Sequence, residues 1–218
     1  MSRHPINTNI TLLDQDTFYG MPIQVAHAPY SLEYLQRLFE TINTALSEHS
    51  RVFAFRVDLR FPAWCESISF QQKNQVITRF IRSFKAKINH NRLMARRQNP
   101  NAHASSVRYV WAREQDMSTN PHYHVVIFLN HDAFNTVGKF EFYRDNIFNR
   151  LHEAWASALS IPVESVHGLV EIPPNAGYLL RRDDPLSIAD FFYRASYLCK
   201  ANTKVYGDWI HCFGCSRG

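Results

Sequence analysis

The chain has 218 residues, of which 45% are hydrophobic, and it contains only 7 glycines and 10 prolines. This length and composition indicate a compact globular protein of one domain and exclude a long unstructured linker or repeat array. The 24 Lys and Arg residues outnumber the 19 Asp and Glu residues, so the formal net charge is +5. That balance favours a polyanionic partner.

Membrane and secretory segments are also excluded by the sequence. No apolar run approaches the roughly 20 residues of a membrane helix, and residues 1–30 lack the features of a signal peptide. We therefore expect a cytoplasmic protein with no membrane partner. The four cysteines are too scattered for a disulfide framework. His211, Cys212 and Cys215 with Cys199 leave a zinc site as an alternative, although one C-x-x-C near a terminus supplies only part of a ligand set.

The first half of the chain alternates between helical and strand patterns. Residues 31–48 carry apolar side chains at helical spacing and predict a packing helix. Residues 51–61 alternate apolar and polar side chains and predict a strand, which Pro62 ends. On its polar face, Arg56 and Arg60 flank Asp58, and these side chains either form the floor of a site, contact DNA, or make an internal salt-bridge network.

A long basic helix is predicted over residues 67–97. Lys and Arg side chains that neutralise phosphates supply the sequence-independent part of DNA affinity, so we interpret the cationic residues of this helix as DNA contacts. A solvated helix face is the alternative. The cationic residues are Arg79, Arg82, Lys85, Lys87, Arg92, Arg96 and Arg97.

The second half of the chain predicts a β-hairpin, two helices and a further strand. The hairpin comprises residues 107–114 and 122–129, joined by a polar loop over 115–121. A helix over 140–159 and a strand over 166–172 follow. Asp184 and Pro185 then begin a last helix that runs to about residue 201.

This order of elements predicts an α+β fold, with a central antiparallel sheet of about four to five strands and helices packed against it. No repeat or linker marks a domain boundary. We expect residues 1–50 to be an N-terminal segment that carries the packing helix and belongs to the same unit as residues 51–218.

The hairpin contains a candidate metal site. His122 and His124 are two residues apart on a strand, so their side chains leave the same face. If the hairpin is symmetric about its loop, Glu114 lies opposite His122 on that face. Two imidazoles and one carboxylate suit a divalent ion such as Mg²⁺ or Mn²⁺ that accepts phosphate oxygens. The alternative is a pair of hydrogen-bonded histidines on a half-polar strand.

The last predicted helix contains a candidate nucleophile. Tyr193, Tyr197 and Lys200 have the spacing of one helix face. A phenol is a weak nucleophile at its ordinary pKa of about 10, and a neighbouring cation and a metal-polarised target both assist its attack. Tyr197 has Ser196 before it and Lys200 after it, whereas Tyr193 follows Phe191 and Phe192 and fits a packing role better.

Together these motifs resemble the HUH endonuclease superfamily, in which a hydrophobic residue between two histidines marks the metal site and a later helix carries Tyr-x-x-Lys. His122-Tyr123-His124 and Tyr197-Leu198-Cys199-Lys200 match that pattern. More narrowly, four blocks resemble the inovirus gene-2-type, or YagK/YfjJ C-terminal-domain, proteins of phages and genomic islands. The blocks are residues 55–62, 114–124, 196–200 and 213–217.

The resemblance implies an HUH/RRM-like fold over about residues 50–218 and a site-specific, metal-dependent single-strand DNA endonuclease and ligase. Tyr197 would remain joined to the 5′ phosphate, leaving a 3′ hydroxyl for a polymerase. Tyr193 is the weaker candidate for a second nucleophile, because the lysine common between paired tyrosines is missing. The implied role is rolling-circle replication initiation for a phage or mobile element, or transposition or transfer.

The implied partners are single-stranded or hairpin DNA, with exposed aromatic side chains stacking on its bases, together with a host helicase and polymerase. Two alternatives remain at the level of sequence. One is a non-catalytic DNA-binding regulator on the same fold, and the other is an RNA-binding or nuclease module that does not use the tyrosines.

Overall fold

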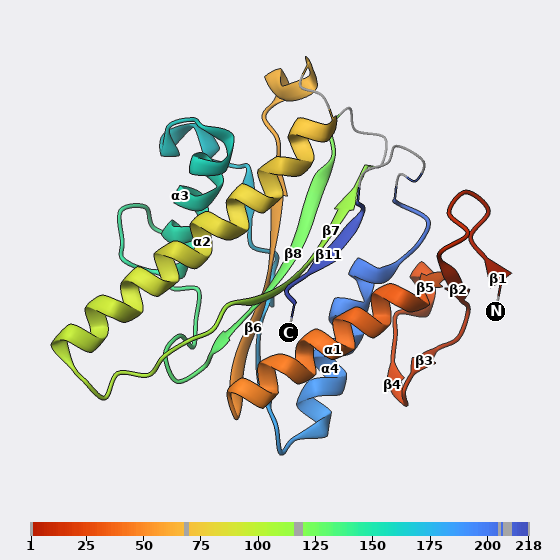
Figure 1. Ribbon diagram of the computed structural model, residues 1–218, viewed down its shortest axis with the longest axis horizontal. Helices are drawn as coiled ribbons and strands as arrows, with labels where there is room; N and C mark the ends of the chain where they lie inside the picture. Colours follow the sequence, from red (N-terminus) through yellow and green to blue (C-terminus); the bar gives the residue numbers. More distant parts are fainter. Residues whose placement is uncertain (1, 68–69, 116–119, 205, 207–210, 218) are drawn as a thin grey trace.

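The computed structural model describes residues 2–67, 70–115, 120–204, 206 and 211–217. Its centre is an antiparallel sheet with helices on both faces, so the expected α+β fold is confirmed (Figure 1). The sheet has the order β10-β6-β8-β7-β11, and β9 pairs with β6 beside β10. The strands are β6 (Arg51–Arg60), β7 (Arg108–Glu114), β8 (His122–Asn130), β9 (Val170–Glu171), β10 (Gly177–Arg181) and β11 (Phe213–Cys215).

Two pairs of helices cover the two faces of the sheet (Figure 1). The helices are α1 (Leu32–Glu48), α2 (Phe70–Gln98), α3 (Ile147–Leu159) and α4 (Pro185–Ala195). The odd-numbered β6 residues, such as Phe55 and Val57, pack under α2 and α3, where Trp155 is fully buried. The even-numbered Val52 and Ala54 pack on the opposite side, under α1 and α4. The strict alternation along β6 therefore serves two separate cores.

The N-terminal segment packs on the α1 and α4 side of the sheet. It contains β1 (Ser2–Arg3), β2 (Thr11–Leu13), the hairpin of β3 (Thr17–Phe18) and β4 (Met21–Pro22), the 3-10 helix η1 (Val25–His27) and β5 (Tyr30–Ser31). Leu13, Phe18 and Tyr30 are buried in the same core as Val52 and Ala54. Ser31 begins α1, because its hydroxyl accepts a hydrogen bond from the backbone N–H of Tyr34.

Several element boundaries differ from those that periodicity predicts. The expected helix over 140–159 begins only at Ile147, because Asn146 caps it by accepting a hydrogen bond from Asn149 N–H at 3.0 Å. The expected strand over 166–172 shrinks to Val170–Glu171, since the 3-10 helix η3 (Val163–Val166) occupies its start. The start of the expected helix at residue 67 falls in the 3-10 helix η2 (Ala63–Ser67), and residues 68–69 and 116–119 lie outside the described residues.

The expected last helix ends early, at Ala195 rather than near residue 201. Residues Ser196–Cys199 form the 3-10 helix η4, and the Ser196 hydroxyl donates a hydrogen bond to the carbonyl of Tyr193 at 2.7 Å. The chain then leaves the helix because Lys200 pairs with Tyr30 and Ala201 N–H donates to the carbonyl of Pro29. The prediction that Tyr193, Tyr197 and Lys200 share one helix face is therefore wrong.

Within the described residues the sheet has six strands, which is more than the four to five expected. The additional strands are β10 and β11. Neither carries a readable pattern, because β10 exposes three of its five residues and β11 is three residues long. Among the described helices, none is both long and apolar enough to cross a membrane.

Candidate active site

The sheet face beneath α1 and α4 changes from apolar to polar toward one end. Val126 and Phe128 of β8 are buried in the core, whereas His124 and His122 of the same strand are not part of it. Ala112 of β7 likewise precedes Glu114 on that face. The polar end holds Arg56, Asp58 and Arg60 from β6, His122 and His124 from β8, and Glu114 from β7.

The strand register brings the three predicted metal ligands together. Glu114 pairs directly with His122, as expected, and His124 pairs with Asp58 on the other neighbouring strand. The candidate ligand atoms of Glu114, His122 and His124 all lie within 4.8 Å of one another. Burial, and the nearby His124, lower the pKa of His122 to about 4, so its imidazole is neutral at pH 7, which is the form that binds a metal.

Nε2 of His124 is well suited to bind a metal ion. Nδ1 lies 2.8 Å from Oδ1 of Asp58 and 2.8 Å from Nη2 of Arg56, which also donates to Asp58. Because the ionised carboxylate is the strongest acceptor in this group, we assign the proton to Nδ1, which donates a hydrogen bond to Asp58. Nε2 is then a bare lone pair, buried and without a hydrogen-bond partner, 3.4 Å from Oε2 of Glu114. A buried nitrogen of this kind next to a carboxylate matches the donor set of a divalent-metal site, with Asp58 fixing the tautomer.

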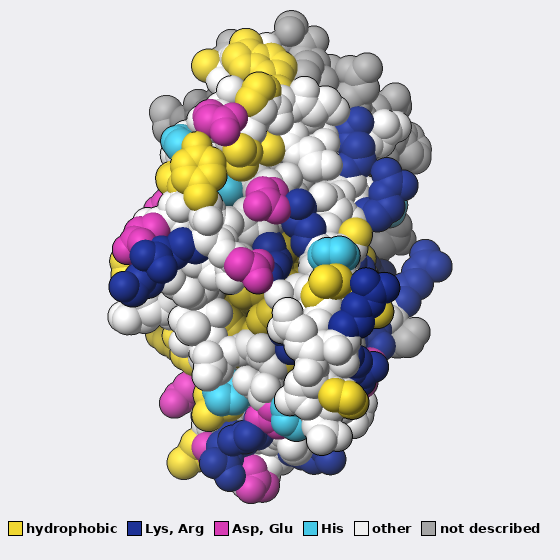
Figure 2. All heavy atoms as spheres, turned by 90° about the vertical axis from the view of Figure 1, so that its left-hand side faces the viewer, with side chains coloured by type: hydrophobic (Ala, Val, Ile, Leu, Met, Phe, Trp, Pro, Cys, Tyr) yellow, Lys and Arg dark blue, Asp and Glu magenta, His cyan; other side chains and the backbone are white. Residues whose placement is uncertain are grey.

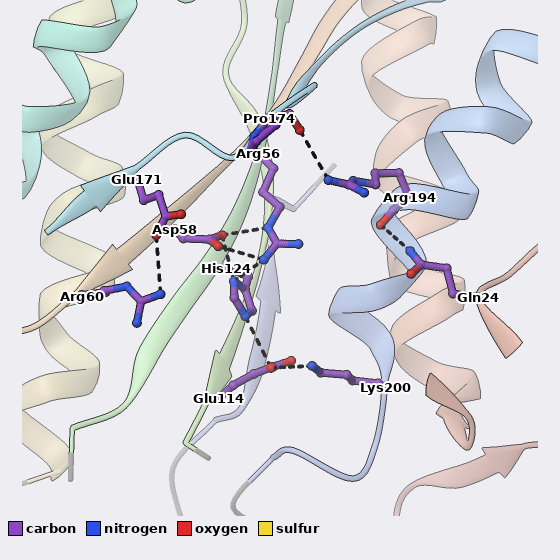
Figure 3. Close-up of polar contacts among 10 residues, drawn as sticks. All are labelled: Gln24, Arg56, Asp58, Arg60, Glu114, His124, Glu171, Pro174, Arg194 and Lys200. Carbon is purple, nitrogen blue, oxygen red and sulfur yellow. Dashed lines mark hydrogen bonds and ion pairs between the residues drawn. The ribbon is translucent and has the colours of Figure 1, made fainter. Parts of the chain in front are cut away.

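The contacts of Asp58 show which role Arg56, on the polar face of β6, takes. Arg56 donates two hydrogen bonds of 2.8 Å to the carboxylate of Asp58, so Arg56 belongs to an internal salt-bridge network (Figure 3). Burial by itself raises the pKa of Asp58, but the hydrogen bond from His124 and the ion pair with Arg56 lower it to about 2. Arg60 lies at the rim, where it makes a half-exposed contact of 3.5 Å with Glu171.

Glu114 is 2% exposed and has a lysine at each carboxylate oxygen. Nζ of Lys200 lies 2.9 Å from Oε2, as Figure 3 shows, and Nζ of Lys204 lies 3.4 Å from Oε1. Burial by itself raises the pKa of Glu114, but His124 and the two lysines lower it well below its usual range, so the carboxylate is ionised. Sequence reasoning missed Lys204, because it follows no motif and lies outside any predicted element.

Tyr197 lies over this polar end, carried by η4 rather than by α4. Its ring centroid is 5.6 Å from that of His124, and Nζ of Lys200 is 3.5 Å from the Tyr197 centroid. The guanidinium carbon of Arg56 is 5.0 Å from the same centroid. His27 of the N-terminal segment, also missed from sequence, meets the ring edge-on at 4.9 Å. The phenol is therefore grouped with the metal-ligand cluster.

Tyr193 is placed differently from Tyr197. It lies in the last turn of α4 with 45% of its surface exposed. Its backbone carbonyl accepts hydrogen bonds from the Gln24 amide and the Ser196 hydroxyl. The packing role expected for Tyr193 is therefore wrong, since its side chain is among the exposed large hydrophobic ones.

The basic residues of α2 lie on the opposite face of the sheet from the candidate site, because α2 packs in the other core. Figure 2 shows Lys and Arg side chains in a row along one side of the face formed by α2 and α3. Arg79, Arg82, Arg96 and Arg97 are exposed. The others are engaged within the protein: Lys85 over the ring of Tyr109, Lys87 with Glu153, and Arg92 over the ring of Phe134.

The zinc alternative gains no support from the described part of the chain. There, the one group of three or more His, Cys, Asp or Glu residues that can hold a metal is Glu114, His122 and His124. Cys199 and Cys212 are buried, and burial raises the pKa of Cys199 far above its usual range. That thiol is therefore a poor thiolate ligand.

The sequence matches one known protein family over most of its length. A family model, the YagK/YfjJ C-terminal domain, matches residues 13–216. The chain belongs to the YagK/YfjJ C-terminal domain family. The uncharacterized protein YfjJ of Escherichia coli (strain K12) is 35% identical over 195 residues, which cover 85% of this chain and 94% of YfjJ. The uncharacterized protein YagK of the same strain is 29% identical over 202 residues, covering 89% and 97%. No solved structure matches the chain.

The YagK/YfjJ match includes the whole candidate site, from His27 to Lys204. It also reaches further toward the N-terminus than the resemblance that begins near residue 50. This agrees with the way in which Tyr30 and His27 contact Lys200 and Tyr197.

Proposed function

We propose that the protein is a metal-dependent HUH-type tyrosine nickase, which cleaves and rejoins one strand of single-stranded or hairpin DNA. The observation that carries this proposal is the position of Tyr197, whose ring is 5.6 Å from that of the candidate ligand His124 and 3.5 Å from the ammonium of Lys200. A nucleophile, a cation and a three-ligand cluster thus share one end of the sheet.

The chemistry follows from the neighbours of each group. A bound Mg²⁺ or Mn²⁺, held by Glu114, His122 and His124, supplies Lewis-acid polarisation of the phosphodiester. Lys200 and Arg56 place positive charge beside the ring of Tyr197, whose phenol must lose its proton to attack. The Tyr197 oxygen forms a bond to phosphorus, the bond to the 3′ oxygen breaks, and that oxygen takes up a proton. Attack by a 3′ hydroxyl on the phosphotyrosine reverses the steps and joins the strand.

The proposed biological role is initiation of rolling-circle replication for a phage or mobile element in the cytoplasm, together with a host helicase and polymerase. The 3′ hydroxyl that the cleavage releases is the primer that such replication requires. Exposed arginines of α2 and Arg60 at the rim are the proposed phosphate contacts, whereas Arg56 acts within the site.

A denaturing gel tests the proposal. The wild type is incubated with a pool of labelled single-stranded DNA and Mn²⁺, and protein-linked label is scored. We expect an adduct that requires Mn²⁺ and is lost in Tyr197→Phe and in His122→Ala, while the matched variant Tyr193→Phe retains it. DNA binding without any adduct in the wild type would instead support the non-catalytic regulator.

A further inference from the structure

Lys204 is a buried lysine that the chemistry above does not use. Its side chain has no exposed surface, and Nζ lies 3.4 Å from Oε1 of Glu114 and 5.9 Å from the ring centroid of Tyr34. Burying an ammonium costs free energy unless a counter-charge compensates it. Among the described residues, Glu114 is the carboxylate that contacts Lys204, so Lys204 is paired with the same side chain that we assign as a metal ligand.

The charges around the candidate ligands do not favour a cation. Lys200 and Lys204 both contact Glu114, and Arg56 contacts Asp58. Among the described residues of this network, three cationic groups therefore face two carboxylates, while the ligand form of each histidine is neutral. In a partly buried site such charges are weakly screened, so the surplus positive charge repels a divalent ion.

A phosphodiester anion cancels this surplus, because it brings one negative charge to the same place. We propose that Lys204 makes ion binding depend on the DNA phosphate, so that the protein alone binds Mg²⁺ or Mn²⁺ weakly and takes up ion and phosphodiester cooperatively. This inference rests on the proposed function, since it assumes the Glu114, His122 and His124 ligand set. Coupling of this kind is reciprocal, so the ion also strengthens phosphodiester binding.

Two possible roles of Lys204 predict opposite changes in ion affinity when the lysine is removed. If the lysine only orients Glu114 for the ion, removing it weakens ion binding, because the carboxylate loses a restraint. If its charge opposes the ion, removing it strengthens ion binding. Lys204→Met removes the charge while keeping an unbranched side chain of similar size next to Tyr34 and Cys199.

Free Mn²⁺, measured by electron paramagnetic resonance, gives the ion affinity of the full chain without any turnover. Each protein is titrated alone, with dimethyl phosphate as the diester probe, and with sodium chloride of equal ionic strength. His122→Ala serves as the blank. Lys87→Met is the matched charge control, because Lys87 pairs with Glu153 on the opposite face of the sheet.

We expect dimethyl phosphate to strengthen Mn²⁺ binding by the wild type and by Lys87→Met. Lys204→Met binds Mn²⁺ on the order of tenfold more tightly without the diester, and the diester then strengthens binding less. Unchanged or weaker Mn²⁺ binding by Lys204→Met overturns the inference while leaving the proposed function intact. If Lys204→Met does not fold, Lys200→Met removes the other lysine that contacts Glu114, and we again expect tighter Mn²⁺ binding without the diester. Wild-type Mn²⁺ binding no better than that of His122→Ala, with or without diester, contradicts the ligand set and hence the proposed function.

Discussion

Asp58 on β6 accepts a hydrogen bond of 2.8 Å from Nδ1–H of His124 on β8, and this hydrogen bond leaves Nε2 of His124 facing Glu114. The two residues are direct partners in the strand register, so the backbone ladder itself sets the distance between them. A carboxylate behind a ligating histidine fixes its tautomer and its orientation. Asp58 is therefore expected to control ion affinity without contacting the ion.

Asp58→Asn tests this relationship. We predict a loss of Mn²⁺ affinity of about 10- to 100-fold, the range typical for such supporting residues, with the fold preserved. Isothermal titration with Mn²⁺ measures it. The matched control is Asp132→Asn, because Asp132 pairs with Arg51 at the other end of β6 and should leave Mn²⁺ affinity unchanged. Equal affinities for Asp58→Asn and the wild type would show that His124 does not need this carboxylate.

The position of each arginine along α2 predicts its contribution to DNA affinity. The helix begins shortly after β6 ends at Arg60, so Arg79 and Arg82 lie nearer the candidate site than Arg96 and Arg97. At 1.5 Å of rise per residue, Arg96 is about 21 Å further along the helix than Arg82. We predict that Arg79→Ala with Arg82→Ala reduces the slope of log affinity against log salt by about 1.4, which corresponds to two lost phosphate contacts on a single strand.

Fluorescence anisotropy with labelled single-stranded DNA at several salt concentrations provides that measurement. The pair Arg96→Ala and Arg97→Ala removes the same charge from the same helix and should change the slope less. A larger effect from this distant pair would mean that DNA follows the far half of α2, away from Tyr197.

His152 predicts a pH dependence of stability that is independent of the candidate site. The ring is buried in α3, with Nδ1 2.8 Å from the carbonyl of Phe148, and burial lowers its pKa. The unfolded state, with a pKa near 6.5, then takes up a proton before the folded state does as the pH falls. The contribution of His152 to the free energy of unfolding is therefore complete above about pH 6.5 and is lost progressively on acidification.

Urea unfolding of the metal-free protein between neutral and mildly acidic pH measures this contribution. His152→Gln, which cannot take up a proton, should lose less stability on acidification than the wild type. His90→Gln changes an exposed histidine on α2 and should follow the wild type. Parallel pH curves for His152→Gln and the wild type would contradict the prediction.

The sequence predicted those parts of the site that depend on strand periodicity. His122 and His124 share a face because side chains alternate along a strand, and a short polar loop between two strand patterns aligned Glu114 with His122. The prediction for the last helix failed after Ala195, because contacts between residues 200–201 and the N-terminal segment override helical spacing. Even so, Tyr197 and Lys200 remain adjacent, since they are only three positions apart in the sequence.

Lys204 and His27 could not have been predicted as site residues from local pattern. Each reaches the site through a tertiary contact between distant segments, Lys204 with Glu114 and His27 with Tyr197. The basic pattern of α2 was readable in the sequence, but its separation from the site was not, because periodicity does not say which face of the sheet a helix covers.

The identity of the DNA-linked residue tests the central claim most directly. Wild-type protein that has reacted with single-stranded DNA and Mn²⁺ is digested with nuclease and protease, and its peptides are sequenced by mass spectrometry. We predict a nucleotide joined through its 5′ phosphate to Tyr197. A nucleotide on Tyr193 or on any other residue, or no modified peptide from protein that binds DNA and Mn²⁺, would contradict it.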